Sequence, residues 1–210
     1  MTPILMLGAG RMGGALIEGW SLMGAFAPSD LIIRDPYPSK EAEAAAKAGA
    51  RLNPVDSVLA EAKVLLLAVK PQMWREAAAQ IVDHLASDCI IVSIAAGVRS
   101  ADISAAFAGR RVARLMPTTA VAVAKGVASI FAPDPQAMSV AHALFDPVAV
   151  TVDVDDEVVS MLRFGNGAIG TFEACRSMTG PESQNAFEIY GTNGSVVWNF
   201  ETMNELRVYI

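Results

Sequence analysis

A glycine-rich turn near the amino terminus constrains this chain more than any other feature. The turn fits the pattern G-x-G-x-x-G, follows an apolar run at residues 4–7 and precedes a helix-compatible stretch at residues 12–23. In that context Gly8 permits a tight turn, Gly10 lets the backbone approach a pyrophosphate, and Gly13 allows close helix–strand packing. The alternative is a turn that only connects strand and helix. The residues expected to contact a dinucleotide here are Gly8, Gly10, Arg11, Met12 and Gly13.

Apolar runs and helix-compatible stretches alternate through the first part of the chain. Runs rich in Val, Ile and Leu predict strands of a parallel sheet, because both faces of such a sheet are buried. Right-handed crossovers then give an α/β fold, a doubly wound and mostly parallel Rossmann sheet. The expected strands are residues 4–7, 31–34, 64–69, 90–95, 112–116 and 150–154, and the expected helices are residues 12–23, 41–48, 73–85 and 100–107.

The pattern changes near Val150, where apolar and polar residues begin to alternate with a period of two. This alternation and the turn sequence Asn166-Gly167 are typical of antiparallel hairpins. We therefore expect a dinucleotide-binding domain at residues 1–153 and an antiparallel β-meander at residues 154–210. Trp198 and Phe200 predict an apolar face that a homodimer or a higher homo-oligomer would cover. The meander strands are expected at residues 157–164, 168–177, 185–190, 195–200 and 205–210.

Composition argues against several classes of partner. The net charge is −6 and there is no run of Lys and Arg, so nucleic acid is not expected as a partner. No apolar stretch reaches the roughly 18 residues of a membrane span, and there is no basic leader, so we expect a cytoplasmic protein without a membrane partner. Cys89 and Cys175 lack the spacing of a zinc site, and no metal is expected.

The end of the second expected strand carries the residues that choose between NAD and NADP. An acidic residue there commonly binds the adenosine ribose of NAD, whereas a cation accommodates the phosphate of NADP. Asp35 favours NAD, while Arg34, Ser39 and Lys40 would suit a 2′-phosphate, so the pattern leaves NADP or NAD open. A third reading is that Asp35 only begins the turn at residues 36–38.

Residues 4–20, with their glycine turn, resemble the amino-terminal motif of pyrroline-5-carboxylate reductases. Residues 68–71, 93–98 and 114–119 stand in that family's order and spacing, so the resemblance covers about residues 1–153. It departs at Arg11, where Asn is usual, and after Pro117. The resemblance implies that residues following the strand ends line the nicotinamide half of the cofactor. In this chain they are Ala68, Val69, Lys70, Pro71, Ala95, Ala96 and Thr118.

The later part of the chain resembles a different family. Residues 155–173, 187–196 and 204–209 look like the last strands of the glucose-fructose oxidoreductase and inositol dehydrogenase family, in which this sheet builds the subunit interface. That family's Glu-Lys-Pro motif is not found at a corresponding place. Nor does the chain show the helical substrate domain of the reductases. Two families meeting near residues 150–156 suggest a chimera, engineered or natural.

No strong catalytic signature is present. Lys70 and Thr118 are weak candidates for polarising a substrate, while His84 and His142 have no partner pattern and are expected to be solvated or packed. Two functions stay open. The first is a NAD(P)-dependent oxidoreductase that delivers hydride to a small cyclic imine. The second is a cofactor-binding chimera with weak or no catalysis, whose meander serves dimerisation.

Overall fold

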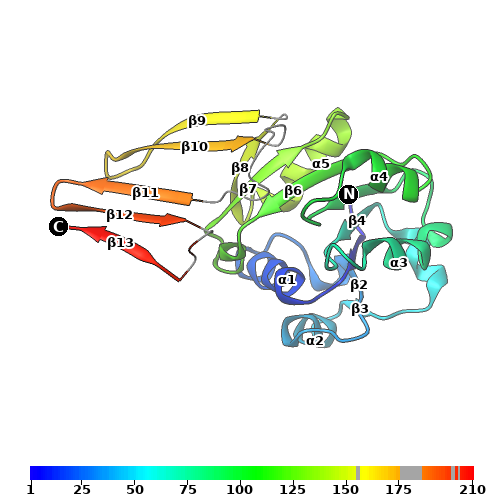
Figure 1. The fold of residues 1–210 in the computed structure, drawn as a ribbon. Helices are drawn as coiled ribbons and strands as arrows, with labels where there is room; N and C mark the ends of the chain where they lie inside the picture. Colours follow the sequence, from blue (N-terminus) through cyan, green and yellow to red (C-terminus); the bar gives the residue numbers. More distant parts are fainter. Residues whose placement is uncertain (155–156, 176–185, 200–201, 203) are drawn as a thin grey trace. The chain divides into compact units, whose positions relative to one another are not determined.

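The computed structural model describes residues 1–154, 157–175, 186–199, 202 and 204–210 (Figure 1). The chain divides into two compact units, Met1–Asp155 and Asp156–Ile210. The first unit carries one mixed sheet covered by helices, and the second consists of antiparallel strands.

The sheet of the first unit has eight strands in the order β3-β2-β1-β4-β5-β6-β7-β8. The stretch from β3 to β6 is parallel and has the strand order of a Rossmann fold. β7 is antiparallel to β6, and β8 pairs with β7 in parallel. The strands are β1 (Ile4–Leu7), β2 (Leu31–Arg34), β3 (Arg51–Leu52), β4 (Val64–Leu67), β5 (Ile90–Ser93), β6 (Val112–Pro117), β7 (Gly126–Phe131) and β8 (Ala149–Asp153).

Helices cover both faces of this sheet, as Figure 1 shows. Alternate residues of each strand point to opposite faces, so Ile4 and Met6 pack in one apolar cluster while Leu5 and Leu7 pack in the other. The first cluster includes α1 (Arg11–Met23), α2 (Lys40–Lys47) and α5 (Pro135–Phe145); the second includes α3 (Trp74–Ala79) and α4 (Ser100–Ala106). The indole N–H of Trp20 donates to the Leu144 carbonyl at 2.7 Å, which links α1 to α5.

The predicted fold class is confirmed, with differences at some elements. The helix expected at residues 73–85 ends at Ala79, and the chain continues as a 3₁₀ turn, Val82–His84. The tightening is visible at the N–H groups of Ile81 and His84, which bond carbonyls three residues earlier. The strands expected to end at residues 69 and 95 end at Leu67 and Ser93. β7 was not predicted from the sequence, while β8 does close the sheet.

The second unit contains antiparallel strands in two sheets. β9 (Glu157–Arg163) pairs with β10 (Ile169–Cys175), and a separate sheet has the order β11-β12-β13. Among the described residues the expected single meander is therefore divided. Residues 176–177 of the strand expected at 168–177, residue 185 of the strand expected at 185–190, and Phe200 lie outside the described residues. The strands of the second sheet are β11 (Ala186–Gly191), β12 (Gly194–Asn199) and β13 (Leu206–Tyr209).

Across the described ranges, no helix is both long enough and apolar enough to cross a lipid bilayer.

Candidate functional site

The glycine turn has a backbone geometry that only glycine accommodates. Gly8 has a φ of 94°, and a Cβ built on it would lie 2.9 Å from the Ala68 carbonyl carbon. A Cβ on Gly13 would lie 2.4 Å from the Gly8 carbonyl oxygen. A Cβ on Gly10, in contrast, would meet nothing within 4 Å. Gly8 and Gly13 therefore serve the turn and its packing, whereas Gly10 leaves open space beside the backbone.

The turn leads directly into the amino terminus of α1. Gly10 is the N-cap residue, no side chain caps the helix there, and its first turn has no acidic residue. The first N–H groups of a helix have no partner within the helix, and they carry the positive end of its dipole. Together with the open space at Gly10, this end of α1 fits a pyrophosphate.

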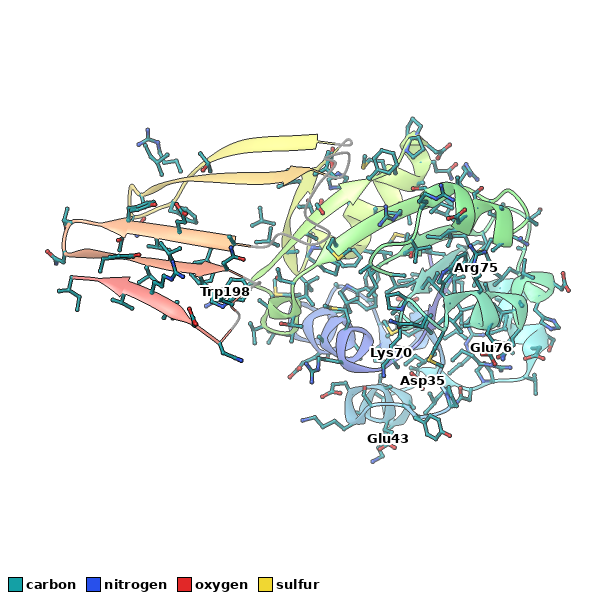
Figure 2. The ribbon with its side chains drawn as sticks, in the orientation of Figure 1. Asp35, Glu43, Lys70, Arg75, Glu76 and Trp198 are labelled. Carbon is teal, nitrogen blue, oxygen red and sulfur yellow. The ribbon has the colours of Figure 1, made fainter. Side chains whose placement is uncertain are left out.

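Parallel register brings the candidate residues to one edge of the sheet. Leu7 pairs with Arg34 and with Leu67, so Gly8, Asp35 and Ala68 follow three neighbouring strands at the same level. Leu67 in turn pairs with Ser93, which continues the edge to β5. Figure 2 shows Asp35 and Lys70 on the same side of the first unit. Ligands of doubly wound sheets bind outside this carboxyl edge.

Asp35 is held tightly against the phosphate loop. Its Oδ2 accepts the Ala9 N–H at 2.6 Å, and its Oδ1 accepts the Tyr37 N–H at 2.7 Å. Asn53 bonds the Asp35 backbone twice, because its Oδ1 accepts the Asp35 N–H and its Nδ2 donates to the Asp35 carbonyl. Asn53 was not singled out from the sequence. The only local signal in the sequence is the pair Asn53-Pro54, which is typical of a turn. In the structure Asn53 has a φ of 47°.

The cations expected near a 2′-phosphate have other contacts. The Arg34 guanidinium donates to the Pro54 carbonyl and forms an ion pair with Asp56. Lys40 Nζ lies 3.6 Å from Glu41 Oε1, and the Lys40 side chain is highly exposed. Ser39 is the N-cap of α2, and its hydroxyl accepts the Ala42 N–H at 3.3 Å.

The segments after β4, β5 and β6 form the other half of the candidate site. Ala68 donates its N–H to the Leu7 carbonyl at 2.8 Å, and Val69 lies close to Gly8. Lys70 is exposed, and Pro71 is half-buried. Ala95 is buried and donates its N–H to the Ser93 hydroxyl, while Ala96 is exposed.

Thr118 lies at the start of the connection from β6 to β7. Its N–H donates to the Val127 carbonyl at 2.9 Å, and its hydroxyl accepts the Val127 N–H at 3.1 Å. These bonds fix the turn and leave the hydroxyl hydrogen of Thr118 available to a ligand. Thr118 can therefore donate to a bound molecule without leaving its place in the turn.

A reactive cysteine and a metal site are two further kinds of functional group that this part of the chain could carry. Cys89 is buried, and this burial raises the pKa of its thiol to about 11, so the reactive thiolate is disfavoured. Within the described residues, no cluster of three or more His, Cys, Asp or Glu side chains is arranged to hold a metal.

A hollow of about 560 Å³ in the first unit lies away from the carboxyl edge. Its walls come from the later turns of α1, the segment before β2 and one face of α2, and they include Trp20, Leu22, Phe26, Leu31 and Ala45. None of its lining residues belongs to the glycine turn. The fitness of the carboxyl edge for a ligand therefore rests on its backbone geometry.

Comparison with known proteins gives this edge a family context. Residues 3–97 match the family model described as "NADP oxidoreductase coenzyme F420-dependent". Pyrroline-5-carboxylate reductase from Methanosarcina acetivorans is 31% identical over 179 residues, which are 82% of this chain and 66% of that protein. The Haemophilus influenzae reductase is 34% identical, over 73% of this chain and 58% of that protein. The chain is a homologue of pyrroline-5-carboxylate reductases. It spans about two thirds or less of their length.

Solved structures agree on the fold of this part. A Coxiella burnetii pyrroline-5-carboxylate reductase superposes with a TM-score of 0.65 at 22% identity, covering 73% of this chain and 59% of that one. The Plasmodium falciparum enzyme, solved with NADP bound, has a TM-score of 0.63 at 17% identity, with 73% and 58% covered. At these identities the likeness shows the fold alone.

The second resemblance is also confirmed. Residues 108–197 match the family model described as "GFO/IDH/MocA C-terminal domain". Levoglucosan dehydrogenase from Pseudarthrobacter phenanthrenivorans is 54% identical over 57 residues, which are 27% of this chain and 15% of that protein. The match to the family model begins at residue 108, earlier than the expected 150, and so includes β6, β7 and β8 of the first unit.

Proposed function

We propose that this chain binds NAD(P)(H) along the carboxyl edge of its Rossmann sheet and acts as an oxidoreductase. The observation that carries this proposal is the contrast among the glycines of the turn. Gly8 and Gly13 have backbone next to their missing Cβ atoms, whereas Gly10 faces open space at the uncapped end of α1. That is the arrangement a pyrophosphate needs. Relation to the reductases supports the choice of a nicotinamide dinucleotide.

The reaction we propose is hydride transfer to a small cyclic imine. The cofactor supplies the hydride when bound, and the protein holds the nicotinamide and the substrate in register. Lys70 would orient an anionic substrate with its exposed ammonium group, and Thr118 would donate its hydroxyl hydrogen to the carboxamide or the imine. Both residues follow strands that end at the same edge.

A titration with NADH and NADPH, followed by nucleotide fluorescence, tests the binding site. Gly10→Ala introduces a methyl group into the open space, where it meets no protein atom within 4 Å, so the fold should be kept. We expect the variant to bind dinucleotide roughly tenfold more weakly or worse, because the methyl group occupies the place of the pyrophosphate. Gly165→Ala is the matched control, since its Cβ also meets nothing within 4 Å.

Three outcomes separate the alternatives. Binding by the wild type, its loss in Gly10→Ala and its retention in Gly165→Ala support the cofactor site. Reduction of pyrroline-5-carboxylate by the same preparation supports the enzyme. Binding without turnover favours the second candidate, a cofactor-binding chimera, and absence of binding by either dinucleotide contradicts both candidates.

We also propose that the second sheet joins two copies of the chain. Phe187 and Ile189 of β11 pair with Trp198 and Val196 of β12, and these residues share one face because alternate residues of a strand point the same way. β13 adds to the same face through its register with β12. The apolar residues of this face are Phe187, Ile189, Val196, Trp198, Leu206 and Val208.

The opposite face of the same sheet carries polar groups beside Ala186 and Val197. Glu188 and Tyr190 lie on it, joined by a hydrogen bond of 2.6 Å, and Ser195 and Arg207 share the face. An amphipathic sheet with an apolar face is self-complementary, and two copies related by a twofold axis would bury that face. The stacked rings of Phe187 and Trp198, with centroids 5.6 Å apart, would form its centre.

Light scattering after gel filtration tests this association. Ile189→Lys places a charge on the apolar face and should shift the protein from dimer to monomer. Tyr190→Lys introduces the same charge at the next residue, on the polar face, and should leave the assembly unchanged. A monomeric wild type, or dissociation by both variants alike, would contradict the proposed interface.

A further inference from the structure

The hollow of about 560 Å³ in the first unit has no part in the proposed cofactor site. Its volume lies within the range of about 300–1,000 Å³ that is typical of small-molecule sites in proteins. α1 supplies one wall through Ile17, Trp20 and Ser21, which recur every three or four residues and so share one face of the helix. α2 and the segment before β2 supply the other walls. The hollow is therefore built from three separate stretches of the chain.

The floor of the hollow is apolar. Trp20 and Leu31 line it and are buried. Gly24 ends α1 with a φ of 61°, so the chain turns back there, and the ring of Phe26 meets the ring of Trp20 edge to face with centroids 5.2 Å apart. Because the Trp20 indole N–H already donates to the Leu144 carbonyl, this floor offers a ligand only carbon surface.

Two carboxylates stand at the walls. Of the lining residues, which all belong to the described part of the chain, Glu18 of α1 and Glu41 of α2 are the charged ones. The Glu41 carboxylate lies against α1, since its Oε2 would be 3.0 Å from a Cβ on Gly14. Its own backbone N–H and the Ser39 hydroxyl lower the pKa of Glu41 below the ordinary value of 4.5. The carboxylate is therefore ionised at neutral pH.

From the apolar floor and the two carboxylates we infer that the hollow binds a small organic cation, an ammonium group carried on an aromatic or branched aliphatic body. The body packs on Trp20 and Phe26, and the ammonium group donates hydrogen bonds to the Glu41 carboxylate. A neutral analogue fills the same space without the charge-assisted bond, and an anion meets like charge. The site lies apart from the carboxyl edge and does not depend on the proposed function.

Isothermal titration calorimetry of the full chain with three indole probes tests this inference. Tryptamine, tryptophol and indole-3-propionate share the ring and carry a cationic, a neutral and an anionic group. Tryptamine should bind about tenfold more tightly than tryptophol, the scale of one charge-assisted hydrogen bond, and indole-3-propionate should bind most weakly. Binding of tryptophol or indole-3-propionate as tight as that of tryptamine would overturn the inference.

The charge of Glu41 is tested by substitution. Glu41→Gln keeps the size of the side chain and should bring the affinity for tryptamine to within about twofold of that for tryptophol. Glu43→Gln is the matched control, because Glu43 lies in the same first turn of α2 and is exposed, but does not line the hollow (Figure 2). It should leave the ratio of the two affinities as in the wild type. An unchanged ratio in Glu41→Gln, or an equal loss in both variants, would contradict the assigned role of Glu41 and overturn the inference.

A second substitution tests the place of binding. Ala44 lines the hollow and is exposed, so Ala44→Trp adds bulk there without replacing a core residue. It should weaken the binding of tryptamine and tryptophol by roughly tenfold or more, while the urea midpoint of unfolding stays the same. Saturating NADH should leave the affinity for tryptamine unchanged.

Three results would overturn the inference at this stage. Full retention of binding in Ala44→Trp would exclude the hollow, and displacement of tryptamine by NADH would assign the amine to the carboxyl edge. An affinity for tryptamine that falls as the protein concentration rises would assign the hollow to a second copy of the chain. If the indole probes behave as expected and neither dinucleotide binds, the proposed function fails and the inference stands.

Discussion

The two units of the chain treat their apolar residues differently. In the first unit the strands of the sheet are covered by helices on both faces, and Ile32, Leu66 and Val92 are fully buried. In the second unit Ile189 of β11 is 60% exposed and Val208 of β13 is 56% exposed. Both units have β-strands rich in aliphatic side chains, yet among the described residues those of the first unit are covered by helices, whereas those of β11 and β13 are exposed.

The difference follows from how the strands are connected. Parallel strands need crossovers, and in the first unit these crossovers carry the helices that bury the sheet. Antiparallel strands need only short turns, such as residues 192–193 between β11 and β12, so among the described residues of the second unit no helix covers their apolar face. A sheet of this kind remains incomplete until something else covers it.

Matched truncations of one aliphatic side chain in each unit test whether burial differs between the two units as described. Leu66→Ala removes a buried side chain from β4 at the centre of the sheet and should lower the free energy of unfolding by about 2–5 kcal/mol. Ile189→Ala removes an exposed side chain and should cost about 0.5 kcal/mol or less at low protein concentration. Urea unfolding monitored by circular dichroism measures both.

The concentration dependence sharpens the same experiment. If two copies bury the apolar face of the second sheet, the cost of Ile189→Ala should grow as the protein concentration rises, because association stabilises only the folded form. Leu66→Ala should show no such growth beyond that of the wild type. Equal costs for the two variants at every concentration would mean that Ile189 is covered within a single chain.

The sequence predicted the elements whose signals are local. The glycine turn, β2 and the start of α4 were each specified by a few adjacent residues. In contrast, β7 lies between residues 126 and 131 with little periodicity, and its place depends on pairing with β6. The break after Ala79 likewise has no Gly or Pro to announce it. Such features depend on tertiary contacts, which a local pattern does not contain.

The same limit applies to the candidate site. Arg34 and Asp35 were both candidates for the ribose end of the cofactor, and their order in the sequence could not separate their roles. In the structure the two residues have different partners distant in sequence: Arg34 forms an ion pair with Asp56, and Asp35 accepts the Ala9 N–H. His142 was expected to have no partner pattern, but it lies between two carboxylates, because β8 brings Asp153 beside α5.

The smallest predicted effect concerns the pH dependence of stability. It comes from His142, which links α5 to β8, the last strand of the first unit. His142 Nδ1 lies 3.0 Å from Asp146, and its Nε2 lies 2.8 Å from Asp153 at the end of β8. The hydrogen bond to Asp146, with the charges of both carboxylates, raises the pKa of His142 above its ordinary value of 6.5. The folded state therefore holds the proton more tightly than the unfolded state does.

The sign of the pH dependence follows from that raised pKa. The stabilisation by protonated His142 is fully present below about pH 6.5, the value for the unfolded chain, and is lost as the pH rises through the folded-state pKa. Because the group is partly exposed, the loss should be about 1 kcal/mol or less. His142→Gln should flatten this part of the stability profile between about pH 6 and 8.5, measured by urea unfolding. A profile unchanged in His142→Gln would mean that packing with β7, and not the paired imidazolium, holds β8 at the edge of the first unit.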